Sequence, residues 1–188
     1  MRRSTHVKMA KLLAEVLDIP NIPEFIKGMK LPDSGLNRFK VRHTKENTLY
    51  QVRLLLELNS SRWLQSEMFS HNLGVILHYT MDYFAKYHEN DHMFDKTTRH
   101  TLYELYTHHV WNRGFEKKAR EYLAGIGHVV GEDIIASFDT VDFLETKIRE
   151  KYLSPSTPRR DLEYAFNTSF IIGTVLTKRW QDRKHIMG

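Results

Sequence analysis

The sequence predicts an all-α protein, a single-domain multi-helix bundle, and three observations support this class. Apolar residues recur at helical spacing along nearly the whole chain, and no segment shows the alternating pattern of a half-buried strand. The 188 residues fit one domain with a core of ordinary size. A hydrophobic content of 41% is that of a globular protein and not of a disordered one.

The expected helices of the first half follow from capping residues and helix breakers. Thr5 can cap a first helix, which Pro20 and Pro23 end. The stretch 30–44 is rich in turn-forming residues and is predicted to be an ordered loop. Asn59–Ser61 would break one helix and cap the next. These signals predict helices at about 5–18, 24–29, 45–58 and 62–87.

The second half is expected to be helical as well. The polar stretch 89–95 is predicted to be a loop, after which Asp95 or Thr97 would cap the next helix. Asp161 falls in the first turn of the last helix, where the helix dipole favours an acid. Helices are therefore predicted up to about Trp111, then at about 113–124, 139–153 and 158–182.

Composition excludes several protein classes. The chain has no cysteine, so disulfides and thiolate metal sites are excluded. Its N-terminal segment is basic and then apolar, but charged residues interrupt the apolar run, which predicts an amphipathic helix and not a signal peptide. No run approaches the ~18 apolar residues of a membrane span. We therefore expect a cytoplasmic protein without a transmembrane segment.

The chain carries a net charge of +5, with a pI of about 9.3. Such an excess favours phosphates on nucleic acid, lipid headgroups or nucleotides, although a solvated basic surface is the simpler explanation. Peripheral membrane contact and nucleic-acid contact both stay open, and the oligomeric state is not indicated.

Three His-x-x-x-carboxylate pairs occur in the sequence, whereas composition alone yields about one. Residues i and i+4 lie on one face of a helix, so each pair can aim an imidazole and a carboxylate at one point. Imidazole and carboxylate ligands suit a zinc-like ion. The pairs are His78 with Asp82, His100 with Glu104, and His128 with Glu132. The last pair has Gly131 next to its glutamate and is an example of a pair that arises by chance.

The context of His78 and Asp82 distinguishes their pair. They lie within LGVILHYTMDYF, where burial without a partner would be costly, so they form either a buried His–Asp hydrogen bond or a metal site. His88 stands six residues past Asp82, about 240° round a continuous helix. It can join the site only if the helix ends near 84–87. A short loop between antiparallel helices would then add His100 and Glu104.

Other candidates lie upstream. Taken alone, His6, Asp33 and His43 are more simply explained as caps or exposed polar residues than as site residues. Four further histidines are set aside as surface residues or as supports for ligands: His71, His92, His108 and His109.

These motifs resemble the zinc-dependent phospholipase C family, which is related to S1/P1-type nucleases. Members carry LG-x-x-(L/M)-H-Y-x-x-D on a long helix, then a histidine six residues past the aspartate, then His-x-x-x-Glu on the next helix. The chain matches with LGVILHYTMD, His88 and HTLYE, and THVKMAK, LPDSG and RHTKEN supply the upstream residues in order. The likeness covers about residues 4–110, which form the metal-site half of the chain. The C-terminal helices, at about 113–182, follow this half.

The resemblance implies a zinc phospholipase C-type bundle with two or three zinc ions. One ion would be held by His88, His100 and Glu104, and a second by His43, His78 and Asp82. His6 would bind the third, with Asp82 bridging. Asp33 would be the general base, or a further ligand, in activating the water that attacks phosphorus. In secreted members an N-terminal tryptophan amine binds the third ion, whereas Met1-Arg2-Arg3 precede His6 here.

The function predicted from this pattern is zinc-dependent hydrolysis of a phosphoester in a lipid headgroup or nucleotide. Two alternatives stay open: a non-catalytic helical binding or scaffold protein with a structural metal site, and a P1-like nuclease. HD-type phosphohydrolases need an adjacent His-Asp, which the chain lacks. Ferritin-like di-iron bundles need two Glu-x-x-His motifs on separate helices, and the one that fits, Glu89 to His92, falls in a predicted loop.

Overall fold

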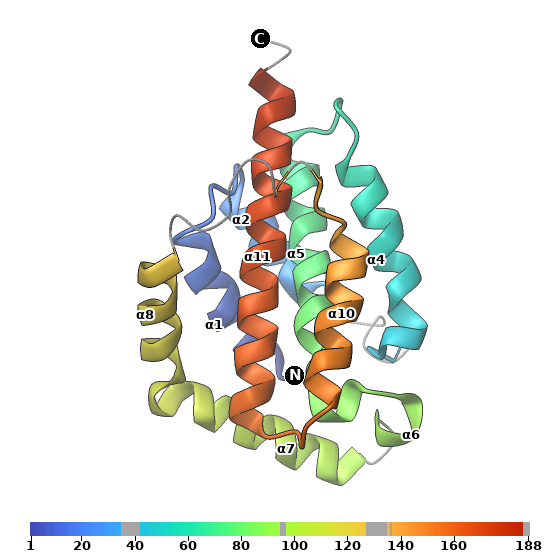
Figure 1. Ribbon diagram of the computed structural model, residues 1–188, viewed down its shortest axis with the longest axis vertical. Coiled ribbons are helices and arrows are strands. Elements are labelled where there is room, and N and C mark those ends of the chain that lie inside the picture. The colour runs from blue at the N-terminus through green and yellow to red at the C-terminus, as the bar shows by residue number, and fades with distance from the viewer. Residues whose placement is uncertain (35–41, 95–96, 127–134, 136, 186–188) are drawn as a thin grey trace.

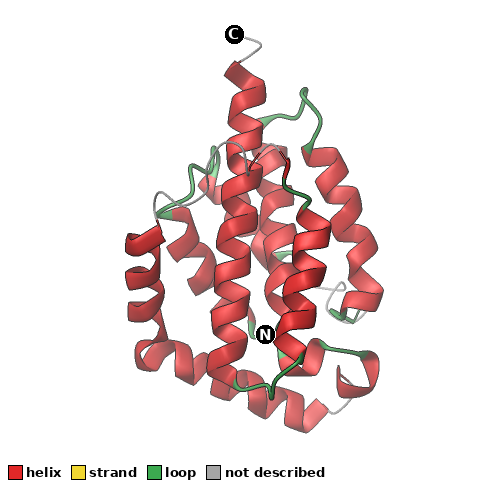
Figure 2. Cartoon of the chain, in the orientation of Figure 1, coloured by secondary structure: helices red, strands yellow, loops and turns green. Residues whose placement is uncertain are grey.

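The computed structural model describes residues 1–34, 42–94, 97–126, 135 and 137–185. Within these ranges the chain forms helices joined by turns and loops, with no strand (Figure 2). The predicted all-α class is therefore confirmed. None of the described helices combines the length and the apolar character needed to cross a membrane.

The helices pack around α5, which lies behind the long α11 in Figure 1. Helices α4 and α10 lie on one side of this pair, α1 and α8 lie on the other, and α7 crosses the lower end. In chain order the elements are α1 (Arg3–Ala14), α2 (Ile22–Lys30), α4 (Lys45–Asn59), α5 (Ser66–Tyr83), the 3₁₀ turn η1 (Lys86–His88), α6 (Asp91–Phe94), α7 (Thr97–Val110), the π-type turn η2 (Trp111–Phe115), α8 (Glu116–Ile126), α10 (Thr140–Tyr152) and α11 (Pro158–His185).

Helix α5 is central because it is apolar around most of its circumference. Leu73, Ile76, Leu77 and Met81 are fully buried, and the helix packs against α2, α4 and α11. A helix that is hydrophobic all round belongs in a core. Each such side chain contributes about 1.5–3 kcal/mol by leaving water. His78 and Asp82 are therefore held inside the protein by their apolar neighbours.

Two glycines let α2 approach α5 closely. A Cβ atom on Gly74 would overlap the backbone of Phe25 in α2, and a Cβ on Gly28 would overlap the carbonyl of His71 in α5. Any side chain at either position would force the helices apart. This close approach brings the C-terminal end of α2, with its Met29 carbonyl, against His78.

The structure corrects the predicted boundaries of the long helix. It spans Ser66–Tyr83 and not 62–87, and Gln65 is its N-cap. The cap expected at Asn59–Ser61 was wrong, because Asn59 is the last residue of α4 and its side chain accepts a 2.9 Å hydrogen bond from Asn72. That bond ties the end of α4 to α5.

The stretch 89–95 was predicted to be a loop, but it contains helix α6. Asp91 explains the difference, because its carboxylate accepts hydrogen bonds from Arg42, Thr44 and Asn47 at 2.7–3.0 Å. Long-range bonds of this kind are not visible in local sequence.

Three further boundary predictions have different outcomes. The first helix ends at Ala14 and not near residue 18, because Leu17 and Ile19 turn into the core. Thr97 is the first residue of α7. Asp95, the His128–Glu132 pair and residues 35–41 of the predicted loop lie outside the described residues.

Candidate metal centre

All eight residues singled out from the sequence as site residues come together in the interior. They derive from α1, the segment after α2, the residues just before α4, α5, η1 and α7. Three groups, of which the first two share His78, each offer ligand atoms within 4.8 Å of one another: His6, His78 and Asp82; Asp33, His43 and His78; and His88, His100 and Glu104.

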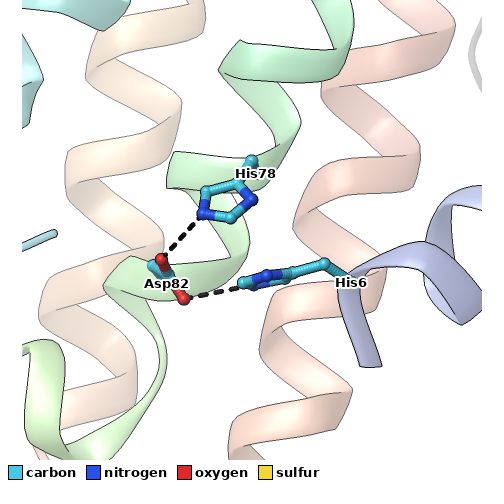
Figure 3. Close-up of side chains that lie close together, drawn as sticks. All are labelled: His6, His78 and Asp82. Atoms are coloured by element: carbon cyan, nitrogen blue, oxygen red, sulfur yellow. Dashed lines mark ion pairs between the residues drawn. The ribbon is translucent and has the colours of Figure 1, made fainter. Parts of the chain in front are cut away.

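The first group joins α1 to α5 (Figure 3). The Nε2 atom of His6 lies 3.1 Å from one oxygen of Asp82, and Nε2 of His78 lies 3.2 Å from the other. All three side chains are fully buried. Asp82 therefore presents one oxygen to each histidine, which is the arrangement that a bridging carboxylate requires.

The second group shares His78 with the first. His43 Nδ1 lies 3.5 Å from His78 Nε2 and 3.0 Å from the second Asp82 oxygen. Asp33 is farther out, with one oxygen 3.8 Å from His43 Nδ1 and 4.0 Å from His78 Nε2. Asp33 thus lies at the edge of the cluster, where its carboxylate is 16% exposed.

The third group depends on where α5 ends. The helix stops at Tyr83, and Ala85 adopts an extended conformation before η1. The helix therefore ends early enough for His88 to join the site, as the sequence required, and the chain turns back and buries this ring. Its Nε2 lies 3.0 Å from His100 Nε2 and 3.4 Å from Glu104 Oε1, while His100 Nε2 lies 3.2 Å from the same Glu104 oxygen.

The amino group of Met1 lies between the groups, a position that the motif analysis did not predict. It is 2.6 Å from Asp82 Oδ1, 2.9 Å from His88 Nε2 and 3.0 Å from Glu104 Oε1. Burial lowers the pKa of this amine, but the charges of Asp82 and Glu104 outweigh burial and raise the pKa to about 11. In the structure it acts as a buried cation that neutralises two of the carboxylates.

Backbone carbonyls orient two of the rings. His78 Nδ1 lies 2.8 Å from the carbonyl oxygen of Met29, and His88 Nδ1 lies 3.0 Å from that of His43. A carbonyl only accepts, so Nδ1 must carry the proton in each ring. Nε2 then directs a lone pair into the cluster, which is the usual support of a metal-ligating histidine.

The electrostatics favour anionic carboxylates and neutral imidazoles at His78 and His88, whereas at His6 the charge of Asp82 outweighs burial and raises the pKa. Burial, together with the positive charge of His6, lowers the pKa of His78 to about 4, and burial also lowers the pKa of His88. Burial raises the pKa of Asp82, but nearby positive charges, led by His88, hold it well below its usual range. Metal ligation requires these protonation states at neutral pH.

The spacing of the donor atoms fits a zinc-like ion. Tetrahedral zinc with Zn–N bonds of about 2.0–2.1 Å places neighbouring ligand atoms about 3.3 Å apart. The three donor pairs of the third group lie 3.0, 3.2 and 3.4 Å apart. Both ring nitrogens of His6 and one oxygen of Asp33 are also buried without a hydrogen bond. Buried polar atoms rarely stay unsatisfied, so the donor set suits a cation.

Comparison with protein families agrees with this geometry. The family model described as zinc-dependent phospholipase C matches residues 5–157. The chain belongs to the zinc-dependent phospholipase C family. Searches of curated proteins and of solved structures gave no match. The resemblance predicted over about residues 4–110 is confirmed, and the match extends it through α10.

A buried ion pair next to the centre was missed by the sequence reading. Asp161 and Lys151 are both fully buried and lie 3.3 Å apart. Asp161 belongs to α11, which begins just after the last residue matched by the family model. Asp161 also accepts hydrogen bonds from Lys86 N–H at 2.9 Å, Tyr103 at 2.7 Å and Ser156 at 2.5 Å. Its position in a first helical turn had indicated only a dipole effect. Through Lys86 and Tyr103, this carboxylate holds the two elements that present His88 and Glu104.

The four histidines set aside join none of the three groups. His71 is one-third exposed and lies 3.6 Å from Glu24. His108 contacts Thr5 at 2.9 Å, which fastens α7 to α1. His109 stacks on Tyr106 on an outer face of α7.

Proposed function

We propose that this protein is a zinc-dependent hydrolase of phosphodiester bonds, with phospholipase C-like chemistry. The observation that carries the proposal is the sharing of Asp82 between donor sets: its two oxygens face different histidines, and its neighbours extend to His88 and Glu104. Clustered donor sets of this kind hold two or more ions close together, as hydrolysis of phosphodiesters requires.

Three donor sets drawn from these groups would hold zinc, with Asp82 assigned to two of them. His88, His100 and Glu104 form one donor set, His43, His78 and Asp82 a second, and His6 with Asp82 the nucleus of a third. Bound zinc supplies charge that neutralises a phosphodiester and lowers the pKa of water. The protein supplies rigid placement, since carbonyls fix the rings of His78 and His88, and the apolar helix α5 holds His78 and Asp82.

The open side of the centre is formed by its partly exposed members. Asp33 and Glu104 are 16% and 22% exposed, and His100 is 13% exposed, whereas Asp82 and His78 are fully buried. A substrate phosphate therefore meets the centre along the edge between Asp33 and Glu104. On that edge Asp33 can accept the proton of the attacking water, or it can act as a further ligand.

The test measures metal content and diesterase activity together. Purified protein is analysed for zinc per chain and assayed with bis(p-nitrophenyl) phosphate. Asp82→Asn, which keeps the shape of the side chain, and His78→Ala should both lose zinc and activity. His71→Gln is the matched control, since it changes a partly exposed histidine of the same helix. Full zinc content in both site variants would show that the assignment is wrong.

Asp33→Asn separates the two roles of that residue. If Asp33 is the base, the variant keeps its zinc and loses at least about 100-fold in kcat, in line with general-base catalysis. If it is a ligand, the variant loses zinc as well. Unchanged zinc and unchanged kcat would remove Asp33 from the site.

The competing functions differ in their substrates. A phospholipase C-like enzyme hydrolyses phosphatidylcholine vesicles, whereas a P1-like nuclease degrades single-stranded nucleic acid. A protein that binds zinc, loses its fold on chelation and cleaves neither substrate is a scaffold with a structural metal site.

A further inference from the structure

A second cavity lies on the outer face of the junction between α7 and α8. Its volume is about 310 Å³, within the range of small-ligand pockets, and Tyr106, Val110 and Phe115 form its apolar walls. Tyr106 stands two residues past Glu104, about 200° round the helix, so the cavity opens away from the metal centre. This placement makes it distinct from the proposed hydrolytic site.

The cavity exists because the chain bends at Gly114. This residue has φ 125° and ψ 0°, a conformation that residues with a side chain rarely adopt. The bend ends the π-type turn and starts α8 in a new direction, as the lower left of Figure 1 shows. It places Arg113 at the end of one element and Lys118 in the first turns of the next, and both side chains line the same cavity.

Three cationic side chains from three elements surround this space, and no carboxylate lines it. Arg113 and Lys118 are exposed and make no hydrogen bond or ion pair with any other described residue. Arg159, at the start of α11, lies 3.3 Å from Glu163. Among the described residues, this is the one ion pair that any of the three cations forms. On α8 beside the cavity, by contrast, Lys117 lies 3.9 Å from Glu121 and Arg120 bonds Glu116. Three gathered cations, two of them without an acidic partner among the described residues, favour an anion between them.

The walls indicate what accompanies the anion. Phe115 is nearly buried at the base of the cavity, while Tyr106 is 57% exposed at its mouth with the His109 ring stacked on it. Leu102 and Leu105 continue the exposed apolar face from Tyr106 along α7, at 60% and 42% exposure. An anionic group with an attached apolar body fits this combination better than a bare ion.

We propose that this cavity binds the phosphate group of a phosphate ester, with Arg113, Lys118 and Arg159 around the phosphate and Tyr106 and Phe115 against the organic part. Guanidinium and ammonium groups form the charge-assisted hydrogen bonds that phosphate oxygens require. The ester can be a soluble phosphomonoester or the headgroup of an anionic phospholipid. The two sources share this chemistry, and the exposed leucines of α7 are the reason to test a membrane.

The test uses the backbone amide of Gly114 as the reporter. Isotope-labelled full-length protein is titrated with phenyl phosphate, and the Gly114 N–H resonance is followed by NMR. We expect a saturable shift that is at least about tenfold weaker in affinity in the double variant Arg113→Gln/Lys118→Gln, since both unpaired cations are lost. Lys117→Gln, one residue away on the same helix but outside the cavity, should bind as the wild type does.

A second arm identifies the source of the phosphate. Cosedimentation compares phosphatidylcholine vesicles with vesicles that also contain phosphatidic acid. Binding to the second kind alone, lost in the double variant, assigns the site to a lipid headgroup; a Gly114 shift with phenyl phosphate and no vesicle binding assigns it to a soluble ester. The proposal is overturned if phenyl phosphate leaves the Gly114 resonance unmoved and phosphatidic acid adds nothing to vesicle binding, or if the double variant binds both probes with wild-type affinity. All variants are exposed substitutions, and unfolding midpoints check that they fold.

Discussion

Replacing Asp161 with asparagine tests the buried network that connects α11 to the metal centre. The substitution keeps the size of the side chain and removes its charge, which leaves the Lys151 ammonium buried without its partner. Breaking a buried ion pair in this way costs about 3–5 kcal/mol. We therefore expect Asp161→Asn to lower the free energy of unfolding by that amount at pH 7.

An independent bound on this magnitude comes from the titration of Lys151. An unpaired buried lysine can lose its proton, and at pH 7 this costs at most about 5 kcal/mol relative to an ordinary lysine pKa. Burial already lowers the pKa of Lys151 in the wild type, and the charge of Asp161 offsets part of that shift. This ceiling coincides with the upper end of the range for breaking a buried ion pair, so the expected cost stays at about 3–5 kcal/mol.

The sign of the pH dependence follows from the same reasoning. In the variant, the pKa of Lys151 is lower in the folded than in the unfolded state, so the stability deficit is largest below the folded pKa. It shrinks by about 1.4 kcal/mol per pH unit as the pH rises through the region between the two pKa values. Urea unfolding at pH 7, 8 and 9 measures this recovery.

Lys151→Met is the matched control. It leaves Asp161 with three neutral donors, from Lys86, Tyr103 and Ser156, so a cost below about 3 kcal/mol and no recovery at high pH are expected. Only Asp161→Asn weakens the restraint on Lys86 and Tyr103, so it alone should lower metal affinity about 10- to 100-fold in chelator competition. A deficit for Asp161→Asn under 1 kcal/mol, or one that does not change with pH, would refute the reasoning.

Two further predictions concern packing and the metal. Gly74→Ala should destabilise the fold by about 1–3 kcal/mol in urea unfolding, because the added methyl meets the α2 backbone, and an equally stable variant would contradict the close helix contact. Chelation should lower the thermal midpoint, since it removes a cation from buried carboxylates, and re-addition of zinc should restore it; a midpoint indifferent to chelation would show that no metal supports the fold.

The sequence by itself was sufficient for the helical class and for much of the candidate site. Helical periodicity is a local property, and it identified α5 as a buried helix although its ends were misplaced by four residues each. The i, i+4 geometry likewise depends on one helix alone, so the pairing of His78 with Asp82 and of His100 with Glu104 followed directly from spacing. The family resemblance ordered His6, Asp33 and His43, which spacing alone could not connect to the others.

Tertiary structure decided everything that depends on contacts between distant segments. Whether His88 faces the cluster depends on the chain turning at Ala85, and the Lys86 amide is held there by Asp161, 75 residues away. The same holds for the Met1 amine beside Asp82, for the Met29 carbonyl that orients His78, and for the cationic cavity at Gly114. The sequence determined which chemical groups were present and which helix faces carried them. The packing of α1, α7 and α11 around α5 determined which of these groups meet, because that choice rests on long-range burial and not on local spacing.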